Sequence, residues 1–258
     1  MKPWLPLVLI VTISAASQAP TTLAKGPSES PGVAPIQSHP NGRTYGQWAA
    51  EWWKWAIGVP ASVNPGLMDG AVDCGVMQGA FLDGPKKGHV WFLVGTFGSG
   101  FAFRSCDIPT GTSLFFPLIN AFFGAFLSDP PETRTEEFLR AQVDCEANAL
   151  FVQIDGIEVR NPIQYLAQGP LFDVQVPEDN IFGVGEDVIP QLLLSPSAQQ
   201  GYYIFLRPLS PGQHTIQWMA QWTCFEPPGL FSEDITYELT VRPPNNRVPL
   251  SIGVGRAR

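Results

Sequence analysis

The sequence has few charged residues and no cluster of positive ones. Of its 258 residues, 15 are Lys or Arg and 23 are Asp or Glu, so the formal net charge is −8. An acidic chain without a run of Lys and Arg lacks the positive surface that neutralises phosphate groups. We therefore exclude nucleic acid as a partner.

Long apolar runs are also missing. The apolar run from Trp4 to Ile13 has about half the length that a membrane-spanning helix needs, and no later segment supplies about 20 uninterrupted apolar residues. We therefore expect no membrane span.

The start of the chain is typical of a secretory signal peptide. Lys2 precedes the apolar run, and small residues follow it from Ser14 to Ala19. Cleavage after Ala16 or Ala24 fits this pattern, and we place the signal peptide at residues 1–24. The mature protein is then secreted or periplasmic.

Cysteine is scarce, with four residues in the chain, and an even number in an exported protein indicates two disulfides. Cys74 and Cys106 flank the apolar runs 89–94 and 100–104, which could form a hairpin that brings their Cα atoms within bridging distance. Of the three possible pairings we therefore expect Cys74 with Cys106 and Cys145 with Cys224.

Metal-ligand spacings are absent. No two cysteines lie close together, and His39, His89 and His214 form no H-x-H or H-x-x-x-H pair. The chain also has no G-x-S-x-G motif, no Gly-rich phosphate loop and no H-E-x-x-H motif. We expect neither a metal nor a cofactor.

What the chain has in abundance is Gly and Pro, with 25 and 26 residues, and 12% aromatic residues. This composition is typical of a loop-rich β protein and excludes a coiled coil or a helical bundle. Pro, Ser and Gly dominate residues 25–43, and residues 243–258 are similar, so both are expected to be flexible. Residues 44–242 form one domain in this interpretation.

Two segments have helical periodicity. Thr44 and Gln47 have the spacing of a capping box, and Gly58 and Pro60 end the helix that follows. The second helix is expected over 133–148, with a similar capping box formed by Thr133 and Glu136.

The rest of the folded part of the chain is predicted to form strands. Nine short β-branched and aromatic runs are separated by turn residues, and Asp155-Gly156 suits a two-residue type I′ turn. The runs are 89–95, 100–104, 113–118, 149–154, 157–159, 171–176, 202–206, 214–222 and 235–241. They predict a mainly β fold, a two-layer antiparallel sandwich that is jelly-roll-like or immunoglobulin-like, with an N-terminal Trp-rich helix and one further helix.

The Trp-rich helix supplies the first candidate site. Its apolar face carries Trp48, Trp52 and Trp55, which we expect to plug the open end of the sandwich. Trp53 lies about 100° around the helix from Trp52, at 3.6 residues per turn. It is the ring expected to stay accessible, and it is our candidate for stacking on a sugar.

Polar residues within apolar stretches of the sequence supply the second candidate site. Arg104, Asp107 and Asn120 could converge with Glu51 in a small pocket walled by Phe. Arg104 and Asn120 are then ligand-binding candidates, and Glu51, Asp107 and Arg104 are catalytic candidates. Alternatively, Arg104 pairs with Asp107, and Asn120 satisfies backbone groups in a turn.

A glycosidase would need two carboxylates flanking the scissile bond. Glu51, Asp69, Asp73 and Asp107 could in principle supply them. No spacing singles out a pair.

Three stretches together resemble a set of bacterial exported proteins of unknown function. They are GRTYGQWAAEWWKWAIGVP, the block with HVWFLVG and RSCDIPTGTSLFFPLIN, and PLSPGQHTIQW. The resemblance covers most of the mature chain and implies that these motifs belong to one domain. It transfers no catalytic residue.

We therefore expect an exported, disulfide-stabilised binding or structural module at the cell envelope or outside the cell. Carbohydrate is the ligand class that we favour, and another envelope component is a possible partner. The alternative is a secreted polysaccharide hydrolase or lyase that uses carboxylates near Arg104 and Asn120.

Overall fold

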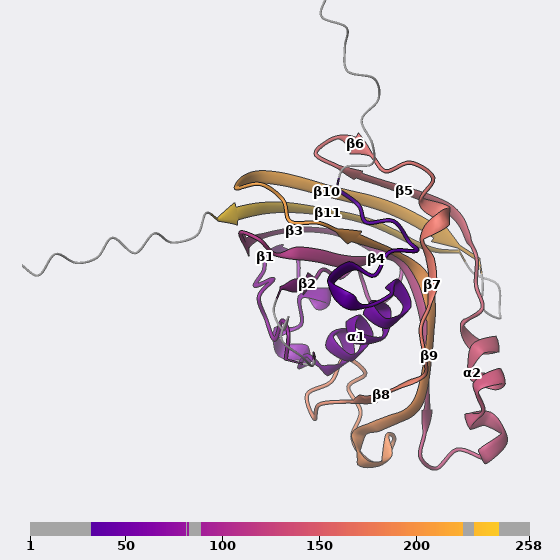
Figure 1. Ribbon diagram of the computed structural model, residues 1–258. Coiled ribbons are helices and arrows are strands. Elements are labelled where there is room, and N and C mark those ends of the chain that lie inside the picture. Colours follow the sequence, from indigo (N-terminus) through magenta and orange to yellow (C-terminus); the bar gives the residue numbers. More distant parts are fainter. Residues whose placement is uncertain (1–31, 81, 83–88, 224–229, 243–258) are drawn as a thin grey trace, which may run out of the picture.

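The computed structural model describes residues 32–80, 82, 89–223 and 230–242 (Figure 1). These residues form two β-sheets packed as a sandwich, with two α-helices, as the sequence predicts. None of the described helices is long and apolar enough to cross a membrane.

One sheet has six strands in the order β1-β3-β11-β10-β5-β6, and the other has five. The five-stranded sheet has the order β2-β4-β9-β7, and β8 also pairs with β9. The six-stranded sheet comprises β1 (Gly70–Ala71), β3 (Gly100–Pro109), β5 (Ala147–Ile154), β6 (Ile157–Glu158), β10 (Gly212–Trp222) and β11 (Phe231–Arg242). The five-stranded sheet comprises β2 (Val90–Phe92), β4 (Ser113–Phe126), β7 (Leu166–Gln168), β8 (Phe172–Gln175) and β9 (Leu193–Leu206).

The strand pairing differs from the expected one around the disulfide. The hairpin of 89–94 with 100–104 does not form, because β2 pairs in parallel with β4 and β3 pairs in parallel with β11. Cys74 and Cys106 are nevertheless bonded, with their Cα atoms 5.8 Å apart. The short strand β1 runs parallel to β3 and brings Cys74 there. The sandwich is thus of mixed strand direction.

The second expected disulfide joins Cys145 to Cys224. Cys224 lies outside the described residues, so this pairing stays a prediction. Among the described cysteines, none is free.

Helix α1 (Tyr45–Gly58) begins and ends as predicted. The Thr44 side chain accepts a hydrogen bond from the Gln47 amide, and the Gln47 side chain accepts one from the Thr44 amide, which completes the capping box. Its Trp residues do not plug the end of the sandwich. Helix α1 lies on the outer face of the five-stranded sheet, on the concave side of its bend (Figure 1), where Trp48 packs against Phe115 of β4 and Phe205 of β9.

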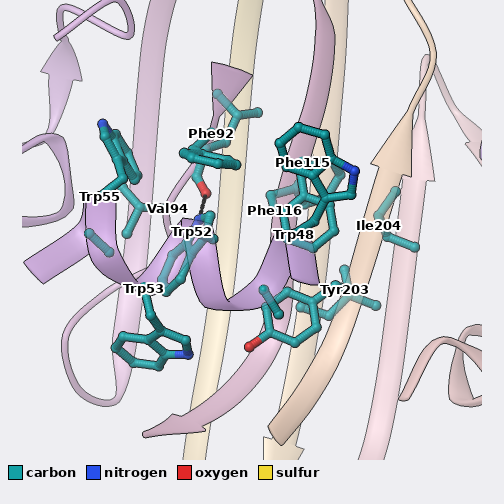
Figure 2. Packing of buried hydrophobic residues seen from close by; sticks show 14 of the residues in the cluster. Trp48, Trp52, Trp53, Trp55, Phe92, Val94, Phe115, Phe116, Tyr203 and Ile204 are labelled. Carbon is teal, nitrogen blue, oxygen red and sulfur yellow. Dashed lines mark hydrogen bonds between the residues drawn. The ribbon is translucent and has the colours of Figure 1, made fainter. Parts of the chain in front are cut away.

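Adjacent residues of β4 show that the five-stranded sheet is covered on both faces. Phe115 lies 6.4 Å from Trp48 on the helix side, whereas Phe116 stacks 5.1 Å from Trp218 of the six-stranded sheet. Alternate side chains of a strand point to opposite faces, so α1 forms a third layer. Figure 2 shows the Trp52 indole donating to the Leu93 carbonyl, at 2.7 Å, which ties α1 to the residue after β2.

The second helix is shorter than expected. Residues Pro131–Arg134 form a 3₁₀ turn, and α2 covers Glu136–Val143. The N-cap is Thr135, whose hydroxyl accepts from the Phe138 amide, rather than Thr133. Pro130 and Pro131 account for the difference, because they favour a separate turn before the helix.

Part of the segment expected to be flexible, from Gly32 to Arg43, packs on the sandwich. Val33 forms an isolated bridge with Leu206, and the Ala34 amide donates to the Phe205 carbonyl at 2.9 Å. The Tyr45 hydroxyl donates to the Ala34 carbonyl at 2.6 Å. Both Val33 and Ala34 are buried.

Two local predictions on the six-stranded sheet are confirmed. Asp155 and Gly156 have φ values of 52° and 74° in the turn between β5 and β6, as a type I′ turn requires. Trp218 and Trp222 of β10 both face inward and are buried.

Candidate functional site

A pocket of about 350 Å³ lies where α1, the β2–β3 loop and the start of β11 meet. We call it the Trp53–Glu233 pocket. Its lining residues are Trp53, Ile57, Thr96, Phe97, Gly98, Asn120, Phe122, Ile181, Phe182, Phe231 and Glu233. Two of the three ligand-binding residues expected from the sequence, Trp53 and Asn120, are therefore brought together.

Trp53 forms a wall of the pocket rather than an open platform. It is only 9% exposed, which differs from the accessible ring that we expected. Its ring centroid lies 4.9 Å from those of Trp52 and Phe122, because a helix that is covered on several sides buries the margin of its apolar face. In Figure 2 the indole nitrogen is turned toward the Tyr203 hydroxyl, but it makes no hydrogen bond of ordinary geometry.

Asn120 lies in the middle of β4 and not in a turn, so the turn alternative is wrong. Its amide nitrogen donates to the Tyr203 hydroxyl at 3.3 Å, and that hydroxyl donates to Gln199 Oε1 at 2.8 Å. Burial raises the pKa of Tyr203 well above its usual value, so the hydroxyl stays protonated and orients the Asn120 amide.

Glu233 is the residue that the sequence interpretation missed. It occupies an inward-facing position of β11, two residues before Ile235 and four before Tyr237, and it is 7% exposed. The Thr96 amide donates to its Oε1 at 3.4 Å, while Oε2 makes no hydrogen bond of ordinary geometry, although the Trp218 indole lies near enough to lower the pKa of the carboxyl. The alternation of buried and exposed side chains in 235–241, extended by two residues toward the N-terminus, would have placed Glu233 on the buried face.

The electrostatic environment keeps the Glu233 carboxyl protonated near neutral pH. Burial raises its pKa to about 8, against the opposing effects of the Thr96 amide, the Trp218 indole and the Arg104 charge. Gly95 leaves the space that the carboxyl fills, because a Cβ on this residue would lie 2.2 Å from Oε2. A protonated carboxyl can both donate and accept a hydrogen bond.

Arg104 does not line the Trp53–Glu233 pocket but fixes the backbone of a loop beside it. The guanidinium is 1% exposed and donates to the carbonyls of Met68 and Val94 at 2.8 Å and to that of Gly66 at 3.4 Å. The Val94 carbonyl also accepts from the Tyr237 hydroxyl at 2.9 Å. Arg104 is thus a positioning residue for the loop that carries Gly95 and Thr96.

The other catalytic candidates lie elsewhere. Asp107 is exposed on β3 and pairs with Arg242, so the expected Arg104–Asp107 pair is wrong. Positions 104 and 107 of one strand face opposite sides, which accounts for the separation. Glu51 pairs with Lys54 on α1, with 3.4 Å between the charged atoms. Neither Glu51 nor Asp107 lines the Trp53–Glu233 pocket, and Asp69 and Asp73 do not line it either.

One wall of the pocket comes from the loop between β8 and β9. Asn180, at its centre, is buried and donates to the carbonyls of Pro177, Glu178 and Val184 at 3.0, 3.3 and 2.7 Å. Its Oδ1 accepts from the Phe182 amide at 3.1 Å. These bonds hold Phe182 in place beside the pocket.

A larger hollow of about 530 Å³ lies near the N-terminal segment. Its lining combines the exposed polar side chains of His39, His89 and Arg207 with apolar residues such as Ala34 and Phe205. None of the buried unpartnered side-chain atoms found in the described part of the chain belongs to its lining. The smaller Trp53–Glu233 pocket therefore has the stronger chemical features of a ligand site.

Two comparisons bear on the wider context. No protein-family model and no curated protein sequence matches the chain.

Within the described ranges, no group of three or more His, Cys, Asp and Glu side chains could hold a metal ion.

Proposed function

We propose that the protein is an exported binding module, at the cell envelope or outside the cell, and that the Trp53–Glu233 pocket binds a carbohydrate. The observation that supports this most is the buried Glu233 carboxyl, which lines a pocket with an aromatic wall and has one oxygen, Oε2, without a hydrogen bond of ordinary geometry. A buried polar group left unpaired costs about 1–3 kcal/mol. We expect a ligand hydroxyl in the pocket to pair with the Glu233 carboxyl.

The remaining lining fits a sugar. Aromatic side chains present flat faces to the C–H side of a sugar ring, and Trp53, Phe122 and Phe182 wall this pocket. Asn120 and the protonated Glu233 can both donate and accept hydrogen bonds, as sugar hydroxyls do. At about 350 Å³, the pocket is near the lower end of ligand-site volumes and suits one or two sugar rings.

Export is supported by two features. The first residues are typical of a signal peptide. The Cys74–Cys106 disulfide is of the kind that persists in oxidising compartments. Either a secreted or a periplasmic location is consistent with both, and so is the resemblance to bacterial exported proteins.

The test is binding of the purified protein to a glycan array, followed by calorimetry with the glycans that bind. Glu233→Gln keeps the size of the side chain and replaces its titrating O–H by an amide, and we expect it to weaken binding about tenfold. Trp53→Phe keeps an aromatic wall without the N–H and should weaken binding less. Asp107→Asn, an exposed acid outside the pocket, is the matched control and should have no effect.

Two results would contradict the proposal. One is an array without any binder at millimolar glycan. The other is a glycan whose affinity is the same for Glu233→Gln, Trp53→Ala and the unmodified protein.

A secreted polysaccharide hydrolase or lyase is the second candidate, and one observation favours it. A carboxyl with its pKa raised to about 8 resembles the general acid of a glycosidase. Against it, Glu233 is the one carboxylate among the described lining residues, whereas the common mechanisms use two. Release of reducing ends or unsaturated products that Glu233→Gln abolishes would establish this activity.

A further inference from the structure

A second hollow adjoins the Trp53–Glu233 pocket. It has a volume of about 310 Å³ and is lined entirely by apolar residues and one glycine. Its main side chains are Phe122, Phe123 and Phe126 of β4, Leu194 of β9, and Phe182 and Val188 of the β8–β9 loop. We call it the phenylalanine groove.

The groove and the pocket are neighbours, because Phe122 and Phe182 line both of them. Phe182 and Val188 are each 46% exposed, so the groove is open to a ligand from solvent. A molecule that fills both hollows must have a polar part and an apolar part joined directly.

From the adjacency of a polar pocket and an apolar groove we infer that the ligand is an amphiphile, with an uncharged sugar head in the Trp53–Glu233 pocket and an alkyl or acyl chain in the phenylalanine groove. The inference rests on the proposed function and specifies its ligand class. It requires that the chain be attached to the sugar and not supplied by a separate molecule.

Charge decides the kind of head group. Among the residues that the structure describes, no Lys or Arg lines either hollow, and Glu233 is the one acidic lining residue. An anionic phosphate head would find no cation there and would face a carboxyl. An uncharged glycoside fits this site, whereas a phospholipid does not.

Size decides against a second protein. Stable protein interfaces bury about 800 Å² on each partner. A groove of about 310 Å³ between one loop and two strands has instead the dimensions of a small-molecule site.

The test measures binding of a homologous series by calorimetry. Methyl, butyl, hexyl and octyl glycosides of glucose, galactose and mannose are titrated into the purified protein below their micelle concentrations. Each methylene transferred from water to the groove should raise the affinity about fourfold until the groove is full. We therefore expect a steep rise from methyl to hexyl and a smaller one to octyl.

Variants separate the groove from the pocket. Val188→Asp introduces a charge and Val188→Trp fills the groove, and each should lower octyl glycoside affinity at least tenfold while methyl glycoside affinity stays unchanged. Ile157→Asp on β6, a similarly exposed residue on the other sheet, is the matched control and should change neither. Glu233→Gln should weaken every member of the series by the same factor.

The outcomes distinguish the two proposals. Binding that is independent of chain length but sensitive to Glu233→Gln overturns the amphiphile and keeps the carbohydrate pocket. Octanol binding as tightly as octyl glycosides overturns the amphiphile too, because the head would then contribute nothing. No binding of any glycoside overturns the proposed function together with this inference.

Discussion

His214 and Asp155 form an ion pair that joins the start of β10 to the β5–β6 turn. The distance from His214 Nδ1 to Asp155 Oδ2 is 2.7 Å, and His214 Nε2 lies 2.8 Å from the Ser210 carbonyl oxygen. Both partners are acceptors, so both ring nitrogens must carry protons for the two hydrogen bonds to form. The arrangement favours the imidazolium.

This pair predicts a loss of stability as pH rises. Burial opposes the charge, but the hydrogen bonds to Asp155 and Ser210 and the Asp155 charge outweigh it and raise the pKa of His214 above 6.5. Its contribution is complete below pH 6.5 and is lost as pH rises through the folded-state pKa. His214→Gln should cost about 1 kcal/mol at pH 5.5 and much less at pH 8.5.

Urea unfolding at both pH values measures this difference. Asp155→Asn should behave like His214→Gln, because Asn tolerates the positive φ of this position but lacks the charge. His39→Gln, which changes an exposed histidine, is the control. Equal losses at both pH values would contradict the imidazolium.

Glu233 is also predicted to make the protein less stable as pH rises, over a wider pH range than His214. With its pKa raised from 4.5 to about 8, the folded state holds a proton that the unfolded state has lost between these values. The free energy of unfolding should fall by up to about 1.4 kcal/mol per pH unit from pH 5 to 8, relative to Glu233→Gln. A constant difference between the two proteins from pH 5 to 9 would show that the carboxyl is ionised throughout.

Arg104 is predicted to stabilise the fold rather than to contact ligand. Arg104→Met leaves the carbonyls of Gly66 and Met68 without their side-chain donor, whereas that of Val94 keeps the Tyr237 hydroxyl, so unfolding should be easier by about 2–3 kcal/mol. Arg242→Met, which removes an exposed arginine, should leave the stability almost unchanged. An Arg104→Met protein of unchanged stability that fails to bind glycan would assign Arg104 a direct contact instead.

Asn180 is predicted to hold the loop that walls both hollows. Asn180→Ala removes the donor to three carbonyls and the acceptor for the Phe182 amide, so the loop should open locally at a cost of about 2–3 kcal/mol. Limited proteolysis should then cut within 177–189 sooner, and glycan affinity should fall. Asn148→Ala, at an exposed position of β5, should leave the cleavage pattern unchanged.

Local signals accounted for much of the fold. The capping box of Thr44 with Gln47, the Asp155-Gly156 turn and the alternation of 214–222 each depend on neighbouring residues, and all three are confirmed. The partners of β2 and β3 depend on residues far along the chain. No local pattern reveals that β3 pairs in parallel with β11.

The candidate site was also predictable only where local sequence patterns reveal it. Trp53 and Asn120 stand out as polar or aromatic groups within apolar runs, and both line the pocket. Glu233 lies just before the strand that the sequence predicts, so the alternation that places it inside was not extended to it. Arg104 stood out equally, but only its tertiary contacts reveal that it serves backbone carbonyls.

The central place of β11 has a consequence for the order in which the protein can assemble. This strand, made last among those described, lies between β3 and β10 and pairs Glu233 with Gly100. A chain that emerges from its N-terminus holds β3 with one edge vacant until residues 231–242 have followed. Pairing between such distant segments is slow, and an unpaired edge is open to wrong partners meanwhile. Assembly of the six-stranded sheet, and of the pocket that Glu233 completes, therefore follows synthesis of the final strand rather than accompanying it.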